Sequence, residues 1–208
     1  MKIKGAVRNI IRELGRLYPH ARCTLDYGEP WQLALNARLA AQCTDARVNI
    51  VAKSLYARYP TLESIAAAEM GALEALVRPT GFYHRKAEDI KCCAAMLCEK
   101  HSGGIPDDME SLLALPGIGR KTANLLLGEL HGKSAVVADT HCIRLSRRFG
   151  FTTGDDPYKV EMTLREILPE REQLPYCHRV VSHGRAVCLA RSPRCGVCAL
   201  RPWCGFTG

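Results

Sequence analysis

The chain has 208 residues, 47% of them hydrophobic and 24% charged, and Lys and Arg outnumber Asp and Glu by 29 to 21, a net charge of +8. This length can bury one large core or two small ones, and the composition excludes a largely disordered chain. No apolar run approaches the length of a membrane span and no signal peptide is expected, so we expect no membrane partner. The basic balance favours a polyanionic partner such as nucleic acid, although many basic proteins bind none.

Helical periodicity runs through almost the whole chain, and alternating strand patterns are almost absent. We therefore predict an all-α protein. In chain order, we expect a first helix with Val7, Ile10, Ile11, Leu14 and Leu17 along one face, and then helices at about residues 30–42, 45–59, 61–77 (capped by Thr61), 86–100, 107–115 (with a capping box of Asp107 and Glu110), 121–130, 140–149, 157–167 and 176–187. Loops are expected at 23–29 and 79–84, and an extended stretch at 136–139.

A glycine turn separates the expected helices on either side of residues 115–123, which read Leu-Pro-Gly-Ile-Gly-Arg-Lys-Thr-Ala. Pro116 and the two glycines stop one helix and permit a tight turn before the next. Such a turn points backbone amides outward at the positive end of a helix dipole, which suits a DNA phosphate. The pattern predicts a helix–hairpin–helix that grips the DNA backbone through Gly117, Ile118, Gly119 and Arg120; a plain helix–helix corner is the alternative.

Two residues near this turn suggest chemistry. The helix dipole, the like charge of Arg120 and an expected partial burial favour the free amine of Lys121, which is then a nucleophile able to form a Schiff base. A phosphate-contacting lysine is the alternative. Asp139 follows the apolar run 135–138 and opens the next helix, where a carboxylate stays ionised. It could stabilise an oxocarbenium-like sugar cation and move protons, or act only as an N-cap.

Four cysteines crowd into the C-terminal tail: Cys188, Cys195, Cys198 and Cys204, separated by six, two and five residues. A chain without secretion signals makes a metal or cluster a better explanation than disulfides. Zinc modules usually present two close pairs, whereas irregular spacing suits a [4Fe–4S] cluster, so the cluster is favoured over zinc. Arginines surround these cysteines, as counter-charges for the cluster or as DNA contacts: Arg185, Arg191, Arg194 and Arg201. The other seven cysteines are expected to be reduced thiols.

Together, the turn at 115–123, the Asp-Thr-His segment at 139–141 and the four-cysteine tail resemble the endonuclease III DNA glycosylases of the helix–hairpin–helix superfamily. Three further segments match that family: Ala-Gln-Cys-Thr-Asp at 41–45, Thr-Gly-Phe-Tyr at 80–83 and His-Gly-Arg at 183–185. The resemblance covers nearly the whole chain, with its motifs in the family's order.

This resemblance implies a bifunctional DNA glycosylase and AP lyase of base-excision repair, which flips oxidised pyrimidines out of duplex DNA. It implies that Lys121 attacks the sugar and that Asp139 is the catalytic carboxylate. Gln42 and Phe82 would fill the vacated space and wedge the duplex. The four tail cysteines would hold a [4Fe–4S] cluster with a structural and redox-linked role. The expected partner is double-stranded DNA with damaged pyrimidines or abasic sites, bound by a monomer that is cytoplasmic and nucleoid-associated if the source is prokaryotic.

The resemblance also implies two helical lobes. One would span residues 22–132 and end in the hairpin, and the other would combine 1–21 with 133–208 and carry the cluster loop at 188–204. Two positions depart from the family pattern: Phe82 stands where leucine is expected, and Cys43 where alanine is common. Mismatch-specific glycosylases of the same superfamily are an alternative, but they lack a lysine at the position of Lys121. A non-catalytic iron–sulfur DNA-binding module is a further alternative, which would need neither Lys121 nor Asp139.

Overall fold

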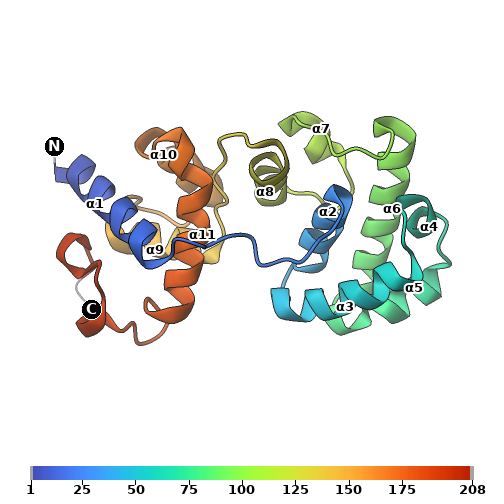
Figure 1. Ribbon diagram of the computed structural model, residues 1–208, viewed down its shortest axis with the longest axis horizontal. Helices are drawn as coiled ribbons and strands as arrows, with labels where there is room; N and C mark the ends of the chain where they lie inside the picture. Colours follow the sequence, from blue (N-terminus) through green and yellow to red (C-terminus); the bar gives the residue numbers. More distant parts are fainter. Residues whose placement is uncertain (1, 207–208) are drawn as a thin grey trace. The chain divides into compact units, whose positions relative to one another are not determined.

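The computed structural model describes residues 2–206, and within that range every regular element is a helix (Figure 1). The expected all-α class is therefore confirmed. The elements are α1 (Lys2–Leu17), α2 (Pro30–Leu39), α3 (Asp45–Arg58), α4 (Leu62–Ala66), α5 (Met70–Val77), the 3-10 turn η1 (Arg78–Thr80), α6 (Tyr83–His101), α7 (Met109–Ala114), α8 (Arg120–His131), α9 (Thr140–Phe149), α10 (Pro157–Ile167), α11 (Glu170–Ala186) and the 3-10 turns η2 (Cys195–Val197) and η3 (Arg201–Trp203). No helix within residues 2–206 combines the length and the apolar character needed to cross a membrane.

The chain divides into two compact units. One contains Cys23–Gly132, and the other combines Met1–Arg22 with Lys133–Gly208. In the first unit, the long helix α6 packs against α2, α4 and α5. It buries Ile90, Ala94 and Leu97, the three positions that the periodicity directs inward. Helix α8 packs against α2 and α7, so the expected hairpin between α7 and α8 rests on this unit's core.

In the second unit, α11 packs against α1, α9 and α10. Its Tyr176 is fully buried, and the Tyr176 hydroxyl lies 2.8 Å from the Ser146 hydroxyl of α9. A buried phenol needs such a partner because an unpaired polar group in a core is costly. The contact therefore fixes α9, the helix that Asp139 opens, against α11.

The single helix expected at 61–77 is wrong, because the chain forms α4 and α5 there. Thr61 does cap α4, as predicted: its side chain accepts a hydrogen bond from Ser64 N at 3.2 Å. The break comes from Glu69, whose carboxylate accepts from Gly71 N at 2.8 Å and Ala72 N at 2.7 Å. A side chain that satisfies two orphan amides starts a new helix at that point.

Other boundaries also differ from the expected ones. Helix α7 is capped by Asp108, which accepts from Ser111 N at 2.8 Å, so the capping box placed at Asp107 and Glu110 is wrong. Helix α6 begins at Tyr83, inside the expected loop. Helix α11 begins at Glu170 instead of the expected residue 176, and it accommodates Pro175 in its interior.

Candidate active site and cluster loop

The hairpin turn contains two glycines in different conformations. Gly117 has φ +76°, and a Cβ there would lie 2.6 Å from Arg38 Cδ. Only glycine combines this left-handed backbone with so close an approach. Gly119 is the N-cap of α8 with φ −97°, and a Cβ there would meet nothing within 4 Å. Gly117 thus anchors the turn on the unit's interior, whereas Gly119 faces open space. The Ile118 side chain is buried, and Ile118 N donates to Leu115 O at 3.1 Å, a hydrogen bond that closes the turn.

Lys121 is the second residue of α8 and is exposed. The expected partial burial is therefore wrong. Cys23, whose thiol is half-buried, lies near Lys121 in the same unit. Burial raises the pKa of Cys23 to about 11, and the nearby Lys121 charge acts in the opposite direction to the carboxylates of Glu129 and Asp45. The amine of Lys121 is thus accessible. The carboxylates of Glu129 and Asp45 interact electrostatically with Cys23, as Lys121 does.

Asp139, in the other unit, is the N-cap of α9. Its Oδ1 accepts a hydrogen bond from Cys142 N at 2.7 Å, so the N-cap role is confirmed. The second oxygen, Oδ2, lies 3.8 Å from His141 Nδ1. The Asp139 side chain is 20% exposed. One oxygen is thus held by the helix terminus, and the carboxylate as a whole still reaches the surface.

Close packing between α9 and α11 supports this end of α9. A Cβ on Gly184 would lie 2.7 Å from His141 Cδ2 and 2.8 Å from Arg144 Nη2. Arg144 in turn donates to the carbonyls of Gly184, at 3.3 Å, and Cys188, at 3.1 Å. Glycine at 184 therefore lets the helix that carries Asp139 contact the start of the cysteine tail.

Gln42 and Phe82 share an unusual backbone, which the sequence did not predict. Both have left-handed φ angles, 54° and 50° respectively. A non-glycine residue in this region is uncommon and carries strain. Both side chains are exposed, and 69% of Phe82 is open to solvent. They lie in the same unit as the hairpin, in the turns that precede α3 and α6.

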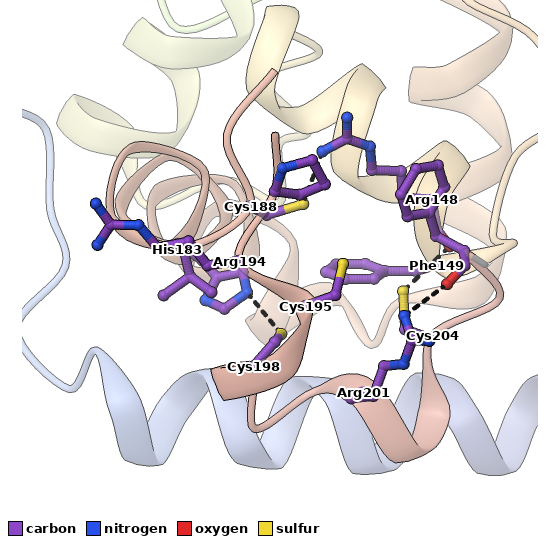
Figure 2. Close-up of a pocket in the computed structure, with 12 residues that line it drawn as sticks. Arg148, Phe149, His183, Cys188, Arg194, Cys195, Cys198, Arg201 and Cys204 are labelled. Carbon is purple, nitrogen blue, oxygen red and sulfur yellow. Dashed lines mark hydrogen bonds between the residues drawn. The ribbon is translucent and has the colours of Figure 1, made fainter. Parts of the chain in front are cut away.

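Figure 2 shows the four tail cysteines around one hollow in the second unit, with the Phe149 ring at its wall. The hollow has about 330 Å³ of atom-free space, part of it open to solvent. All eleven cysteines of the chain are free thiols, so none of the four pairs with another as a disulfide. The structure therefore brings together Cys188, Cys195, Cys198 and Cys204, as the sequence predicts.

The chemistry of these thiols suits an iron–sulfur cluster. Such a cluster is held by cysteine thiolates, one sulfur at each iron. The four thiols around this hollow could each supply one such sulfur. The donor set thus fits a [4Fe–4S] cluster held by these four cysteines.

Two further residues support the cysteine loop: Arg148 was missed from the sequence, and His183 was noted there only within the His-Gly-Arg match. Arg148 donates from Nη1 to Cys188 Sγ at 3.1 Å and to Leu189 O at 2.7 Å. His183 Nε2 lies 3.4 Å from Cys198 Sγ, and its Nδ1 lies 2.9 Å from the Tyr18 hydroxyl. Of the four arginines expected near the cluster, Arg194 and Arg201 line the hollow. Arg148 lies on α9, 40 positions before Cys188, and no local spacing indicates that contact.

The family is shown by comparison with known proteins. Residues 36–170 match the model of the HhH-GPD superfamily base excision DNA repair proteins. The chain belongs to this superfamily. Within it, endonuclease III of Synechocystis sp. is 42% identical over 202 residues, which cover 97% of this chain and 92% of that protein.

Solved structures of endonuclease III bound to DNA have the same fold. A non-covalent endonuclease III–DNA complex matches with a TM-score of 0.92 and 40% identity, covering 97% of this chain and 94% of that one. A trapped endonuclease III–DNA covalent intermediate, described as an estranged-adenine complex, also matches with a TM-score of 0.92 and 40% identity, over 97% and 95% of the two chains. The resemblance seen in the sequence is confirmed, and the chain is a member of the endonuclease III family.

Proposed function

We propose that this chain is a bifunctional DNA glycosylase and AP lyase that removes oxidised pyrimidines from duplex DNA. One observation carries the proposal: an exposed lysine, Lys121, follows the hairpin turn in a chain of the endonuclease III family. An amine beside a phosphate-binding turn is placed to reach the sugar of the strand that the turn holds. Because its relatives are bacterial proteins, we place its action at cytoplasmic DNA. We also propose that it acts as a monomer.

The hairpin binds the DNA backbone. The first amides of α8 have no partner within the helix, and they sit at the positive end of its dipole. Gly117 and Gly119 offer backbone N–H groups to a phosphate, Ile118 N closes the turn by donating to Leu115 O at 3.1 Å, and Arg120 adds a positive charge. Such contacts hold the strand without reading its sequence.

Lys121 carries out the covalent step. Its amine forms a bond to C1′ of the damaged nucleotide while the C1′–N bond to the base breaks, and the base leaves with that electron pair and takes up a proton. Ring opening then gives a Schiff base between Nζ and C1′. Loss of a proton from C2′ and cleavage of the C3′–O3′ bond nick the strand on the 3′ side of the lesion.

Asp139 has two compatible roles. Its Oδ1 caps α9 and so fixes the carboxylate, and the negative charge stabilises the cationic character that C1′ develops as the base departs. It is also a group through which protons can move. Gln42 and Phe82 enter the duplex: one fills the space left by the flipped base, and the aromatic ring unstacks the neighbouring pair.

A [4Fe–4S] cluster held by Cys188, Cys195, Cys198 and Cys204 supplies local order and charge rather than hydrolytic chemistry. The loop between these cysteines contains only the short turns η2 and η3, and Leu200 is its one buried apolar side chain, so a bound cluster would add to the order of the loop. Arg148 already ties the first part of this loop to α9. Iron and acid-labile sulfide in stoichiometric amounts are the expected assay result, and stoichiometric zinc would contradict the cluster.

Borohydride trapping tests the covalent step. With duplex DNA that contains an abasic site, the wild-type protein and the control Lys53→Ala, which removes another exposed lysine of the same unit, should form a covalent adduct. Lys121→Ala should form none, yet should still bind a duplex with a stable abasic analogue. An adduct retained in Lys121→Ala would disprove the assignment of the nucleophile.

The alternatives predict different outcomes when the duplex carries a mismatch or a damaged base and base release is assayed as well. Base release from a mismatched duplex without any adduct would indicate a mismatch-specific glycosylase. Binding to lesion duplexes without base release or nicking would indicate a non-catalytic iron–sulfur module.

A further inference from the structure

Helix α6 carries a buried lysine that the chemistry proposed above does not use. Lys86 is the fourth residue of α6 and is 1% exposed. Its ammonium Nζ donates to Leu39 O at 2.8 Å and to Thr80 O at 2.8 Å. A buried ammonium is costly unless it is hydrogen-bonded, so these two carbonyls are what make a lysine tolerable at this position.

The two carbonyls belong to the segments that lead into Gln42 and Phe82. Leu39 is the last residue of α2, just before the turn that contains Gln42. Thr80 ends η1, just before Phe82. The backbone of Lys86 contributes as well, because Lys86 N donates to Phe82 O at 3.1 Å. One residue thus holds backbone groups on both segments.

Both segments need such support. Gln42 and Phe82 have φ angles of 54° and 50°, a region that residues with a side chain rarely adopt. Strained backbone persists only where its surroundings impose it. Neither side chain is buried, so packing of Gln42 or Phe82 itself cannot impose this conformation.

A second buried charge fastens the same end of α2. Asp89, one turn further along α6, is 4% exposed and accepts from Arg38 Nε at 2.6 Å. Arg38 and Leu39 are therefore both tied to α6, one through its side chain and the other through its carbonyl. Gly117 of the hairpin packs against Arg38 and Asp89, so the hairpin rests on the same buried network.

We propose that Lys86 is a positioning residue for the DNA wedge: its single ammonium bridges the two segments and fixes the spacing and direction of Gln42 and Phe82. The inference rests on the proposed function, in which these two side chains enter the duplex. Their separation must match the gap beside a flipped nucleotide, and an error of about 1 Å in such placement can cost about a hundredfold in rate.

Lys86→Met tests this role, because methionine keeps much of the aliphatic length and removes the donors. The matched control is Lys91→Met on the same helix: Lys91 donates to the Ala68 carbonyl, at the break between α4 and α5 and outside the two wedge segments. For Lys86→Met we expect nicking of an abasic site in duplex DNA to fall about ten- to a hundredfold. Nicking of an abasic site in a single strand, where no partner strand needs to be wedged, should stay at the wild-type rate.

Two further measurements separate positioning from simple destabilisation. In a Gln42→Ala/Phe82→Ala background, Lys86→Met should have little further effect on duplex nicking, because residues that act as one unit are not additive. The fluorescence of 2-aminopurine opposite a stable abasic analogue should rise when wild-type protein or Lys91→Met binds, and rise less with Lys86→Met. This second signal reports unstacking without any chemistry, so it tests the wedge even if the proposed function fails through absence of a borohydride adduct.

Equal losses on duplex and single strand, an undiminished loss in the wedge-less background, or an equal loss in Lys91→Met would each overturn the inference. If Lys86→Met does not fold, Lys86→Gln retains an NH₂ donor and can still bond one carbonyl. A selective loss on duplex DNA is then expected from Lys86→Gln, and wild-type nicking by a folded Lys86→Gln would contradict the inference.

Discussion

The two hairpin glycines allow a controlled test of how the turn is held. Gly117→Ala and Gly119→Ala each add one methyl group, two residues apart. At Gly117 the methyl would lie 2.6 Å from Arg38 Cδ and 3.0 Å from Asp89 Cβ, on a backbone with φ +76°. At Gly119 it would meet nothing within 4 Å, on a backbone with φ −97°.

The expected effects follow from these geometries. For Gly117→Ala, the left-handed backbone costs about 1–2 kcal/mol and the steric overlap about 1–3 kcal/mol. Arg38 cannot move away freely because its Nε is held by Asp89 at 2.6 Å. The lower entropy of the unfolded alanine chain offsets about 0.4–1 kcal/mol. The net loss in free energy of unfolding is about 2–4 kcal/mol for Gly117→Ala.

For Gly119→Ala, alanine is a poorer N-cap than glycine by about 0.5–1 kcal/mol, and the unfolded-state gain is of similar size, so the net change is about zero. Urea unfolding of the full-length protein, followed by circular dichroism, measures both values. DNA is left out because Gly119 faces the proposed phosphate site, where a methyl also affects binding. If Gly117→Ala unfolds within about 0.5 kcal/mol of wild type, or if both variants lose the same amount, the close approach at Gly117 does not stabilise the turn.

Three further variants or measurements test other parts of the protein. Asn caps a helix about as well as Asp, so Asp139→Asn should retain the free energy of unfolding while Asp139→Ala loses about 1 kcal/mol. Base release should fall in both variants. An Asp139→Asn variant as unstable as Asp139→Ala would contradict the cap geometry. Arg148→Met removes donors to Cys188 Sγ and its neighbouring carbonyls, so the absorbance of the proposed cluster should bleach faster in air than in the wild type. An unchanged bleaching rate would contradict a supporting role. Because the pKa of Cys23 is raised to about 11, its thiol is neutral at pH 8, so alkylation in the folded protein should be slow at pH 8 and accelerate toward pH 11. The stability that comes from the raised pKa is present below the unfolded thiol's pKa near 8.5 and is lost as the pH rises through about 11. Rapid alkylation of Cys23 at pH 8, measured by mass spectrometry, would show that the thiol is not buried as described.

The helices and the glycine turn could be predicted because their signals are local. An apolar face recurs every three or four residues, as at Ile90, Ala94 and Leu97, and burial of that face is what makes each helix stable. The turn is marked by Pro116 and two glycines that no helix interior tolerates well. The four cysteines could also be grouped in advance, because three of them lie within ten residues of one another.

Helix boundaries were harder because one side chain decides each of them. Glu69 splits a continuous helical pattern by capping α5, although Glu is not among the preferred N-cap residues. Asp107 and Asp108 are adjacent and chemically identical, and only the final turn geometry selects Asp108 as the cap. Neither choice is visible in periodicity, which averages over whole turns.

The supporting residues of the site could not be predicted for a different reason: their partners are remote in sequence. The contact of Lys86 with Leu39 joins residues 47 positions apart, and both partners are ordinary in their local sequence. The partial burial expected for Lys121 is wrong, and nothing in the local sequence marks Lys86 for burial. In the structure Lys121 is exposed, whereas Lys86 is buried and its ammonium donates to two backbone carbonyls. Since the burial of an ammonium depends on where carbonyls converge in space, reactive and positioning lysines can be told apart only after the fold is known.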